Sequence, residues 1–171
     1  MRSVKKALQE RRITLMEGNS KMKIVIGCDH AGFTLKEKII SVLKELDMEV
    51  EDVGTYSNES ANYAPIAQVV AEKVASNDNI KGILICGTGI GMSIMANKVH
   101  GIRAALVHDT FSAEATRAHN DSNILCMGER VIGSGLAIEI TKKWIATQFD
   151  AAKHGERIQF IHDYECGNQI G

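Results

Sequence analysis

The sequence contains one proline, few aromatic residues and no long apolar run. Only 5% of its 171 residues are Phe, Trp or Tyr, and no apolar stretch approaches the roughly 20 residues that a membrane-spanning helix needs. The formal net charge is -1, which gives no reason to expect nucleic acid as a partner. The four cysteines form no C-x-x-C pair. This excludes a zinc knuckle or thioredoxin-like motif and favours a reducing compartment, the cytoplasm.

The rest of the composition is that of one globular domain. Hydrophobic residues make up 44% and charged residues 24% of the chain, both ordinary proportions. Residues 1–21 differ, because they are rich in Lys and Arg and lack the apolar segment of a secretory signal. We expect 1–21 to be an N-terminal extension, either disordered or the product of a start site upstream of a true initiator at Met22. The domain then covers 22–171.

From Lys23 onward, strand and helix patterns alternate with short connections. We expect strands at 24–27, 49–53, 82–86, 103–107 and 123–127. We expect helices at 33–46, 64–76, 92–99, 112–118, 134–148 and 150–165. This alternation predicts an α/β fold, a Rossmann-like three-layer α/β/α sandwich around a five-stranded parallel sheet. Ligands of such sheets bind beyond the carboxyl ends of the strands.

The stretch from Lys81 to Val99 carries the strongest chemical signal. An apolar strand ends at Cys86, and a glycine-rich turn at 87–91 leads into a helix. Such a turn presents unpaired N–H groups to an anion, or to an oxygen that gains negative charge. A thiol beside these groups suits a base or a nucleophile, although Cys86 also fits a small core residue that ends a strand. The spacing is neither the dinucleotide-binding pattern nor a P-loop.

Polar side chains stand at the ends of the other strands as well, and each has an ordinary structural explanation. Asp29 fits a helix N-cap, Arg130 a solvated loop charge, and Lys153, His154 and Arg157 the exposed face of the last helix. Their joint placement favours a functional site.

Four motifs resemble one family. They are GCDHAGF at 27–33, ILICGTGIGMSIMANK at 83–98, GIRAALV at 101–107 and AHNDSNIL at 118–125. From Met22 to about Tyr164 the chain resembles ribose-5-phosphate isomerase type B, a group that includes the galactose-6-phosphate isomerase subunits. The resemblance implies an aldose–ketose isomerase without metal or cofactor. Its reaction would interconvert ribose 5-phosphate and ribulose 5-phosphate through an enediolate, in the non-oxidative pentose phosphate pathway.

The resemblance also implies residue roles. Cys86 would be the base, Thr88 a proton shuttle on the substrate oxygens, and His119 the acid–base group that opens the sugar ring. The implied substrate-binding residues are Asp29, His30, Gly87, Thr88, Gly89, Ile90, Gly91, Asn120, Arg130, Lys153 and Arg157. Family members are homodimers or dimers of dimers with sites at the subunit boundary, so His119 would serve the partner's Cys86.

The chain departs from the family pattern at two places in the domain. Lys153 stands where many members have arginine, which replaces a bidentate fork by a point charge. Asn62 stands where an aspartate is frequent. Three alternatives stay open: an isomerase of another sugar phosphate, such as allose or galactose 6-phosphate, a flavodoxin-like binding module, and a partner subunit that has lost activity.

Overall fold

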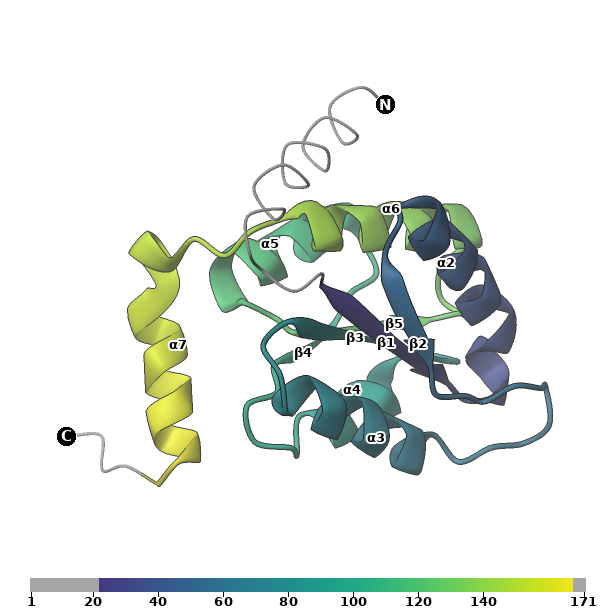
Figure 1. The fold of residues 1–171 in the computed structure, drawn as a ribbon, viewed down its shortest axis with the longest axis horizontal. Coiled ribbons are helices and arrows are strands. Elements are labelled where there is room, and N and C mark those ends of the chain that lie inside the picture. The colour runs from purple at the N-terminus through teal and green to yellow at the C-terminus, as the bar shows by residue number, and fades with distance from the viewer. Residues whose placement is uncertain (1–21, 168–171) are drawn as a thin grey trace.

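The structure, a computed structural model, describes residues 22–167 (Figure 1). The extension expected at 1–21 lies outside the described residues. The elements are, in chain order, β1 (Lys23–Cys28), η1 (His30–Gly32), α2 (Phe33–Glu45), β2 (Glu49–Asp52), α3 (Tyr63–Ala75), β3 (Ile80–Cys86), α4 (Ile90–Ala96), β4 (Ala104–Leu106), α5 (Thr110–Asn120), β5 (Ile124–Gly128), α6 (Ser134–Ala146) and α7 (Ala151–Glu165).

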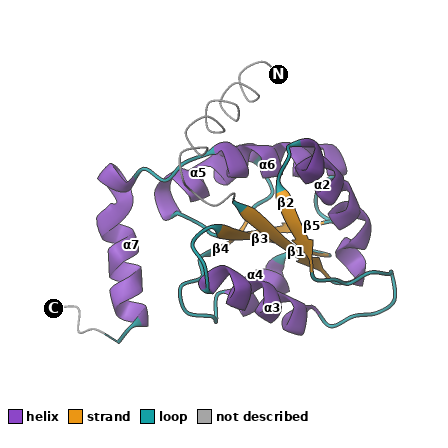
Figure 2. Ribbon diagram, viewed as in Figure 1, coloured by secondary structure: helices purple, strands orange, loops and turns teal. Residues whose placement is uncertain are grey.

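The five strands form one parallel sheet in the order β2-β1-β3-β5-β4. Helices α2, α5 and α6 cover one face, and α3 and α4 cover the other (Figure 2). The predicted three-layer α/β/α sandwich is therefore confirmed. After β1 the chain moves outward to β2 and then returns to β3 on the other side of β1. The strand order thus reverses between β1 and β3, and this is where a ligand site is expected.

Each face of the sheet has its own apolar core. Leu43, Ile140 and Trp144 belong to the core under α2, α5 and α6, while Val70 and Met92 belong to the core under α3 and α4. All five side chains are fully buried. The central strands contribute to both cores because alternate residues point to opposite faces, which accounts for the continuous apolar run in β3.

Two differences from the sequence prediction bear on the site, and the other boundaries differ by at most three residues. Helix α4 begins at Ile90, two residues earlier than expected, because Gly89 adopts the left-handed conformation (φ +77°) and turns the chain directly into the helix. A short 3-10 turn, η1, follows β1 and was not predicted. The Asp29 side chain caps it by accepting a hydrogen bond from the Ala31 amide.

Helix α7 lies beside the β4 edge, apart from the three layers (Figure 1). None of its residues is buried. It is held at both ends, because the Asp150 amide donates to the Ala118 carbonyl and Glu165 accepts from the Gly101 amide, each over 2.9 Å. Within residues 22–167 no helix combines the length and apolar character required to cross a membrane.

Candidate active site

Cys86 is the last residue of β3, and the glycine turn folds back over it. The residue is 6% exposed. The Gly89 amide donates a hydrogen bond to the Cys86 sulfur over 3.0 Å, and the Ile90 amide donates to the Thr88 hydroxyl over 3.3 Å. The turn therefore places the positive end of at least one peptide dipole against the thiol, in addition to the amides that it presents to a ligand.

The turn is held by the ends of β4 and β5. A Cβ added at Gly128 would lie 2.6 Å from the Thr88 backbone, and one at Gly89 would lie 2.6 Å from Cδ1 of Leu106. Glycine is needed at both positions because no other residue permits this approach. The Gly128 amide in turn donates to Nε2 of His108 over 3.1 Å. The turn thus has a fixed position relative to the sheet.

Asp29 and His30 lie directly after β1, beside this turn. Asp29 is 8% exposed, its carboxylate accepts from the Ala31 amide over 2.9 Å, and its own amide donates to the Ile85 carbonyl over 3.2 Å. Nδ1 of His30 accepts from the Ala61 amide over 3.3 Å. Because Nδ1 is occupied as an acceptor, Nε2 of His30 carries the ring proton and is the nitrogen that can donate to a ligand.

Arg130 brings a positive charge to the same place. Its amide donates to the Gly87 carbonyl over 3.0 Å, and a Cβ at Gly87 would lie 3.3 Å from Cδ of Arg130. The preceding residue, Glu129, ties three elements together. Its amide donates to the Cys86 carbonyl over 2.9 Å, and its carboxylate accepts from the Leu35 amide over 2.9 Å.

Helix α3 closes the other side of the turn. A Cβ at Gly91 would lie 2.7 Å from the ring of Tyr63, so this ring covers Gly91. Asn62 caps α3 by accepting a hydrogen bond from the Ala64 amide over 3.0 Å. Asparagine and aspartate are equally good N-caps, so the departure from the family pattern at position 62 leaves the start of this helix intact.

The structure thus brings five predicted polar residues together at the carboxyl edge of the sheet. They follow the ends of β1, β3 and β5, and the strand order reverses between β1 and β3. We call Asp29, His30, Cys86, Thr88 and Arg130 the carboxyl-edge cluster. It contains a thiol, peptide N–H donors, a carboxylate and two cationic or proton-donating groups. Together these groups can transfer a proton and stabilise a negative charge that develops nearby.

The two other cysteines of the sheet are unsuited to this chemistry. Cys28 and Cys126 are fully buried. Burial raises the pKa of the Cys28 thiol to about 12, and it also raises the pKa of Cys126, where the nearby Cys86 adds to the effect. Both thiols are therefore protonated at neutral pH.

The turn at 87–91, with Gly87, Gly89, Ile90 and Gly91, also lies at the carboxyl edge. Four other predicted residues lie elsewhere, and with His154, to which the sequence assigned no role, they form what we call the amino-edge cluster: His119, Asn120, Lys153, His154 and Arg157. Helix α5 runs back against the strand direction, so its last residues lie at the amino end of β5, opposite the carboxyl edge. The rings of His119 and His154 lie 4.5 Å apart between centroids, and Arg157 contacts Nδ1 of His154 over 3.1 Å. Lys153, whose side chain is 78% exposed, lies 3.6 Å from Asp150.

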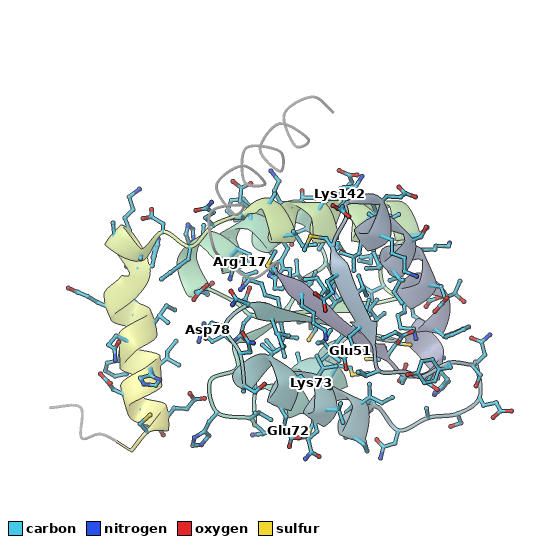
Figure 3. The ribbon with its side chains drawn as sticks, viewed as in Figure 1. Glu51, Glu72, Lys73, Asp78, Arg117 and Lys142 are labelled. Atoms are coloured by element: carbon cyan, nitrogen blue, oxygen red, sulfur yellow. The ribbon has the colours of Figure 1, made fainter. Side chains whose placement is uncertain are left out.

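A dense polar network fixes the end of α5. Asp121, in the left-handed conformation (φ 46°), accepts from Arg117 over 2.8 Å and from Arg103 over 3.1 Å. Arg117, which is labelled in Figure 3, also donates to the Ser122 carbonyl. Its guanidinium lies 5.8 Å from the ring of Trp144. His119 and Asn120 therefore project from a rigid helix end.

The sequence assigned no role to Glu129, His108 or His154. The Glu129 carboxylate accepts a hydrogen bond from the Leu35 amide at the start of α2, which is distant in the sequence. His108 accepts one hydrogen bond, from the backbone amide of Gly128. No local pattern signals either contact. His154 stands within a charged, exposed helix, and only the packing of α7 on α5 reveals its neighbour. Among residues 22–167, no three His, Cys, Asp or Glu side chains converge as metal ligands.

Comparisons with known proteins identify the family of this chain. The ribose/galactose isomerase family model matches residues 24–161. A putative sugar phosphate isomerase of Bacillus subtilis is 56% identical over 148 residues, which are 86% of this chain and 99% of the relative. Ribose-5-phosphate isomerase B of Escherichia coli is 46% identical over 139 residues, 81% of this chain and 93% of the relative.

Solved structures show the same fold. Ribose-5-phosphate isomerase B of Clostridium thermocellum superposes with a TM-score of 0.82 at 47% identity, covering 85% of this chain and 99% of that chain. The family model spans most of the described residues, and both clusters lie within its range. This chain belongs to the ribose/galactose isomerase family.

Proposed function

We propose that this protein is an aldose–ketose isomerase that interconverts ribose 5-phosphate and ribulose 5-phosphate. The observation that carries the proposal is the placement of the Cys86 thiol against the Gly89 amide, in a glycine turn where the strand order reverses. This arrangement suits a base beside preorganised donors. Relatives of this chain that share its fold carry the name ribose-5-phosphate isomerase B.

In the proposed reaction, the Cys86 thiolate removes the proton from C2 of open-chain ribose 5-phosphate. The electrons of that C–H bond form the enediolate, and the amides of the turn at 87–91 stabilise the oxygen on which charge develops. The Cys86 thiol then returns the proton to C1, which yields the ketose. Thr88, whose hydroxyl lies in the same turn, moves the proton between the two substrate oxygens.

We assign the remaining residues to binding and ring opening. Asp29 binds substrate hydroxyls from the carboxyl-edge cluster, and His30 and Arg130 hold the phosphate or the adjacent carbon chain. In the amino-edge cluster, His119 opens the furanose ring and Asn120 holds the sugar near its reacting carbons. Lys153 and Arg157 supply further positive charge for the phosphate.

One chain cannot use both clusters on one substrate, because they lie at opposite edges of the sheet. We therefore propose a homodimer or a dimer of dimers, in which His119 serves the partner's Cys86. Helix α7 supports an interface, because it has no buried residue and exposes Phe160, Ile161 and Tyr164. We place the enzyme in the cytoplasm, since every cysteine of the described chain is free.

The decisive experiment compares the wild-type protein with Cys86→Ala, using ribose 5-phosphate in a coupled assay with and without a chelator. We expect the variant to lose at least ~10³-fold in kcat, because no other group replaces the base. We expect it still to bind ribulose 5-phosphate in a calorimetric titration. Wild-type turnover in Cys86→Ala would refute the assignment of the base.

The preferred sugar is tested separately, by kcat/KM on ribose 5-phosphate, allose 6-phosphate and galactose 6-phosphate. Cys86 and the turn act on C1 and C2, which these sugars share, so the residues that contact the far end of the substrate decide the ranking. We expect ribose 5-phosphate to rank first. A higher kcat/KM on a hexose phosphate would move the function to that sugar and leave the reaction type unchanged.

A further inference from the structure

His154 lies between His119, the proposed ring-opening residue, and Arg157, a proposed phosphate-binding residue. Its ring is tilted by 35° to the ring of His119, with 4.5 Å between the centroids. Its Nδ1 lies 3.1 Å from a terminal nitrogen of Arg157, one turn further along α7. The imidazole is half-buried although no residue of α7 is fully buried, and the contact bridges two helices that are distant in the sequence.

The direction of the hydrogen bond between Arg157 and His154 follows from the chemistry of the two groups. A guanidinium always donates, so Nδ1 of His154 must accept and the ring proton must sit on Nε2. A doubly protonated His154 would lose this bond and would add a positive charge next to Arg157. The neutral ring, in one tautomer, is therefore the form that holds Arg157 in place.

The charges around His154 favour the same form. Loss of hydration lowers the pKa of His154, and the charges of His119, Arg157 and Lys153 lower it further, while Asp150 acts in the opposite direction. These four groups come from both elements that meet here, α5 and α7, and from the segment that joins α6 to α7.

We propose that His154 is a positioning residue that sets the distance between the ring-opening imidazole of His119 and the phosphate-binding guanidinium of Arg157. Its ring face supports His119, and its Nδ1 orients Arg157. The His154 side chain thereby links ring opening by His119 to phosphate binding by Arg157. The inference rests on the proposed function for the tasks of His119 and Arg157, while the contacts themselves do not depend on it.

Two substitutions separate the two contacts. His154→Phe keeps an aromatic ring against His119 and removes the acceptor for Arg157. His154→Asn keeps an acceptor near the position of Nδ1 and removes the ring. His162→Asn is the matched control, because His162 is an exposed histidine on the same helix and contacts Cys166, away from both clusters.

The first pair of readouts measures the two tasks. For His154→Phe we expect inorganic phosphate to inhibit about tenfold more weakly, since one hydrogen bond to a charged group is lost, with an unchanged ratio of kcat on ribose 5-phosphate to kcat on ribulose 5-phosphate. For His154→Asn we expect the reverse: unchanged phosphate inhibition and a ratio that falls about tenfold. Ribulose 5-phosphate is open-chain, so its turnover does not need ring opening.

A third readout does not require activity. In the wild-type protein we expect NMR cross-peaks between the ring protons of His119 and His154, since the ring centroids lie 4.5 Å apart. We expect cross-peaks from the His119 ring to an aromatic ring to remain in His154→Phe and to disappear in His154→Asn. Their absence in the wild type, or equal losses in both kinetic readouts for both variants together with a lower Tm, would overturn the inference. A wild-type protein that turns over neither sugar phosphate would refute the proposed function and leave the cross-peaks as the test of the ring contact.

Discussion

The Gly89 amide points at the Cys86 sulfur from a distance of 3.0 Å. Gly89 itself adopts the left-handed conformation (φ +77°), which lets the chain turn directly into α4 after this hydrogen bond. The glycine turn therefore contacts the proposed base, Cys86, in addition to its proposed role in stabilising the substrate oxygen. The same peptide group that begins α4 holds the thiol in one orientation at the edge of the sheet.

Gly89→Ala is predicted to reduce kcat about 100-fold, the usual effect of displacing one donor of an oxyanion-type site. A methyl group at this position would lie 2.6 Å from Cδ1 of Leu106 and 2.9 Å from the Met127 carbonyl carbon, so the turn must move. The matched control is Gly101→Ala. Gly101 has a similar φ of +82° but no atom within 4 Å of an added Cβ, so it carries only the backbone strain. Steady-state kinetics that show equal kcat in the two variants would contradict this role of the turn.

Lys36→Met is predicted to destabilise the native state by about 3 kcal/mol, because breaking a buried ion pair leaves its partner uncompensated. The Lys36 side chain is fully buried, and its ammonium contacts both Asp52 oxygens, at 2.8 and 2.7 Å, and the Thr55 carbonyl, at 2.7 Å. The free energy of unfolding in urea measures the loss.

The control for this change is Lys73→Met. The pair of Lys73 and Glu51, 2.9 Å apart and partly exposed to solvent, joins α3 to β2 (Figure 3). We expect its loss to cost less than about 1 kcal/mol, since exposed ion pairs are screened by water. Equal destabilisation by the two variants would show that the burial of Lys36 does not matter.

The cysteines are predicted to differ in reactivity at pH 8. With a pKa raised to about 12 by burial, Cys28 has a thiolate fraction of only about 1 in 10,000 at this pH. We expect iodoacetamide to modify the exposed Cys166 first, and ribulose 5-phosphate to protect Cys86 but not Cys166. Mass spectrometry of the peptides measures each rate. Modification of Cys28 in the native protein as fast as that of Cys166 would contradict the prediction.

The same shift predicts how stability depends on alkaline pH. The fold raises the pKa of Cys28 above its ordinary value of 9.0, so the native state favours the neutral thiol. This contribution is complete below pH 9 and is lost as the pH rises from 9 toward 12. We expect the urea midpoint of the wild type to fall more steeply over this range than that of Cys28→Ala.

Much of the fold could be predicted because the pattern of strands and helices is local. Each predicted strand overlaps an observed one, and Cys86 ends β3 as expected. The strand order could not be predicted in the same way, because it depends on contacts between elements. The pairing of β5 between β3 and β4 follows from registers such as Leu84 with Cys126 and Leu106 with Cys126, which no single segment encodes.

The site was only partly readable for the same reason. The residues of the turn at 87–91 adjoin one another in the sequence, so their chemistry was visible there. Lys36 carries no sign in the sequence that its ammonium is buried, because a lysine on an amphipathic helix is usually exposed. His154 and Glu129 are defined by neighbours from other helices, and only the packed structure identifies them.

His119→Asn is predicted to lower kcat on ribose 5-phosphate about 100-fold and to spare kcat on ribulose 5-phosphate, because only the aldose needs its ring opened. Asparagine retains a polar group at the end of α5 and removes the acid–base function. Both values are measured at saturating substrate. Equal losses on the two substrates would rule out a dedicated ring-opening role for His119.

Mixing two inactive variants is predicted to restore activity if each site combines residues of two chains. In a hybrid dimer of Cys86→Ala and His119→Asn, one site carries both substitutions and the other carries neither. Random reassociation makes half of the dimers hybrids, so about a quarter of the wild-type activity on ribose 5-phosphate should return. The two variants are unfolded together, refolded and assayed, with each variant refolded alone as the control. The separation of His119 from Cys86, at opposite edges of one sheet, is the reason for this expectation. A mixture that stays as inactive as its components would place both residues in the same chain's site, and that outcome requires α7 and the end of α5 to move to the carboxyl edge.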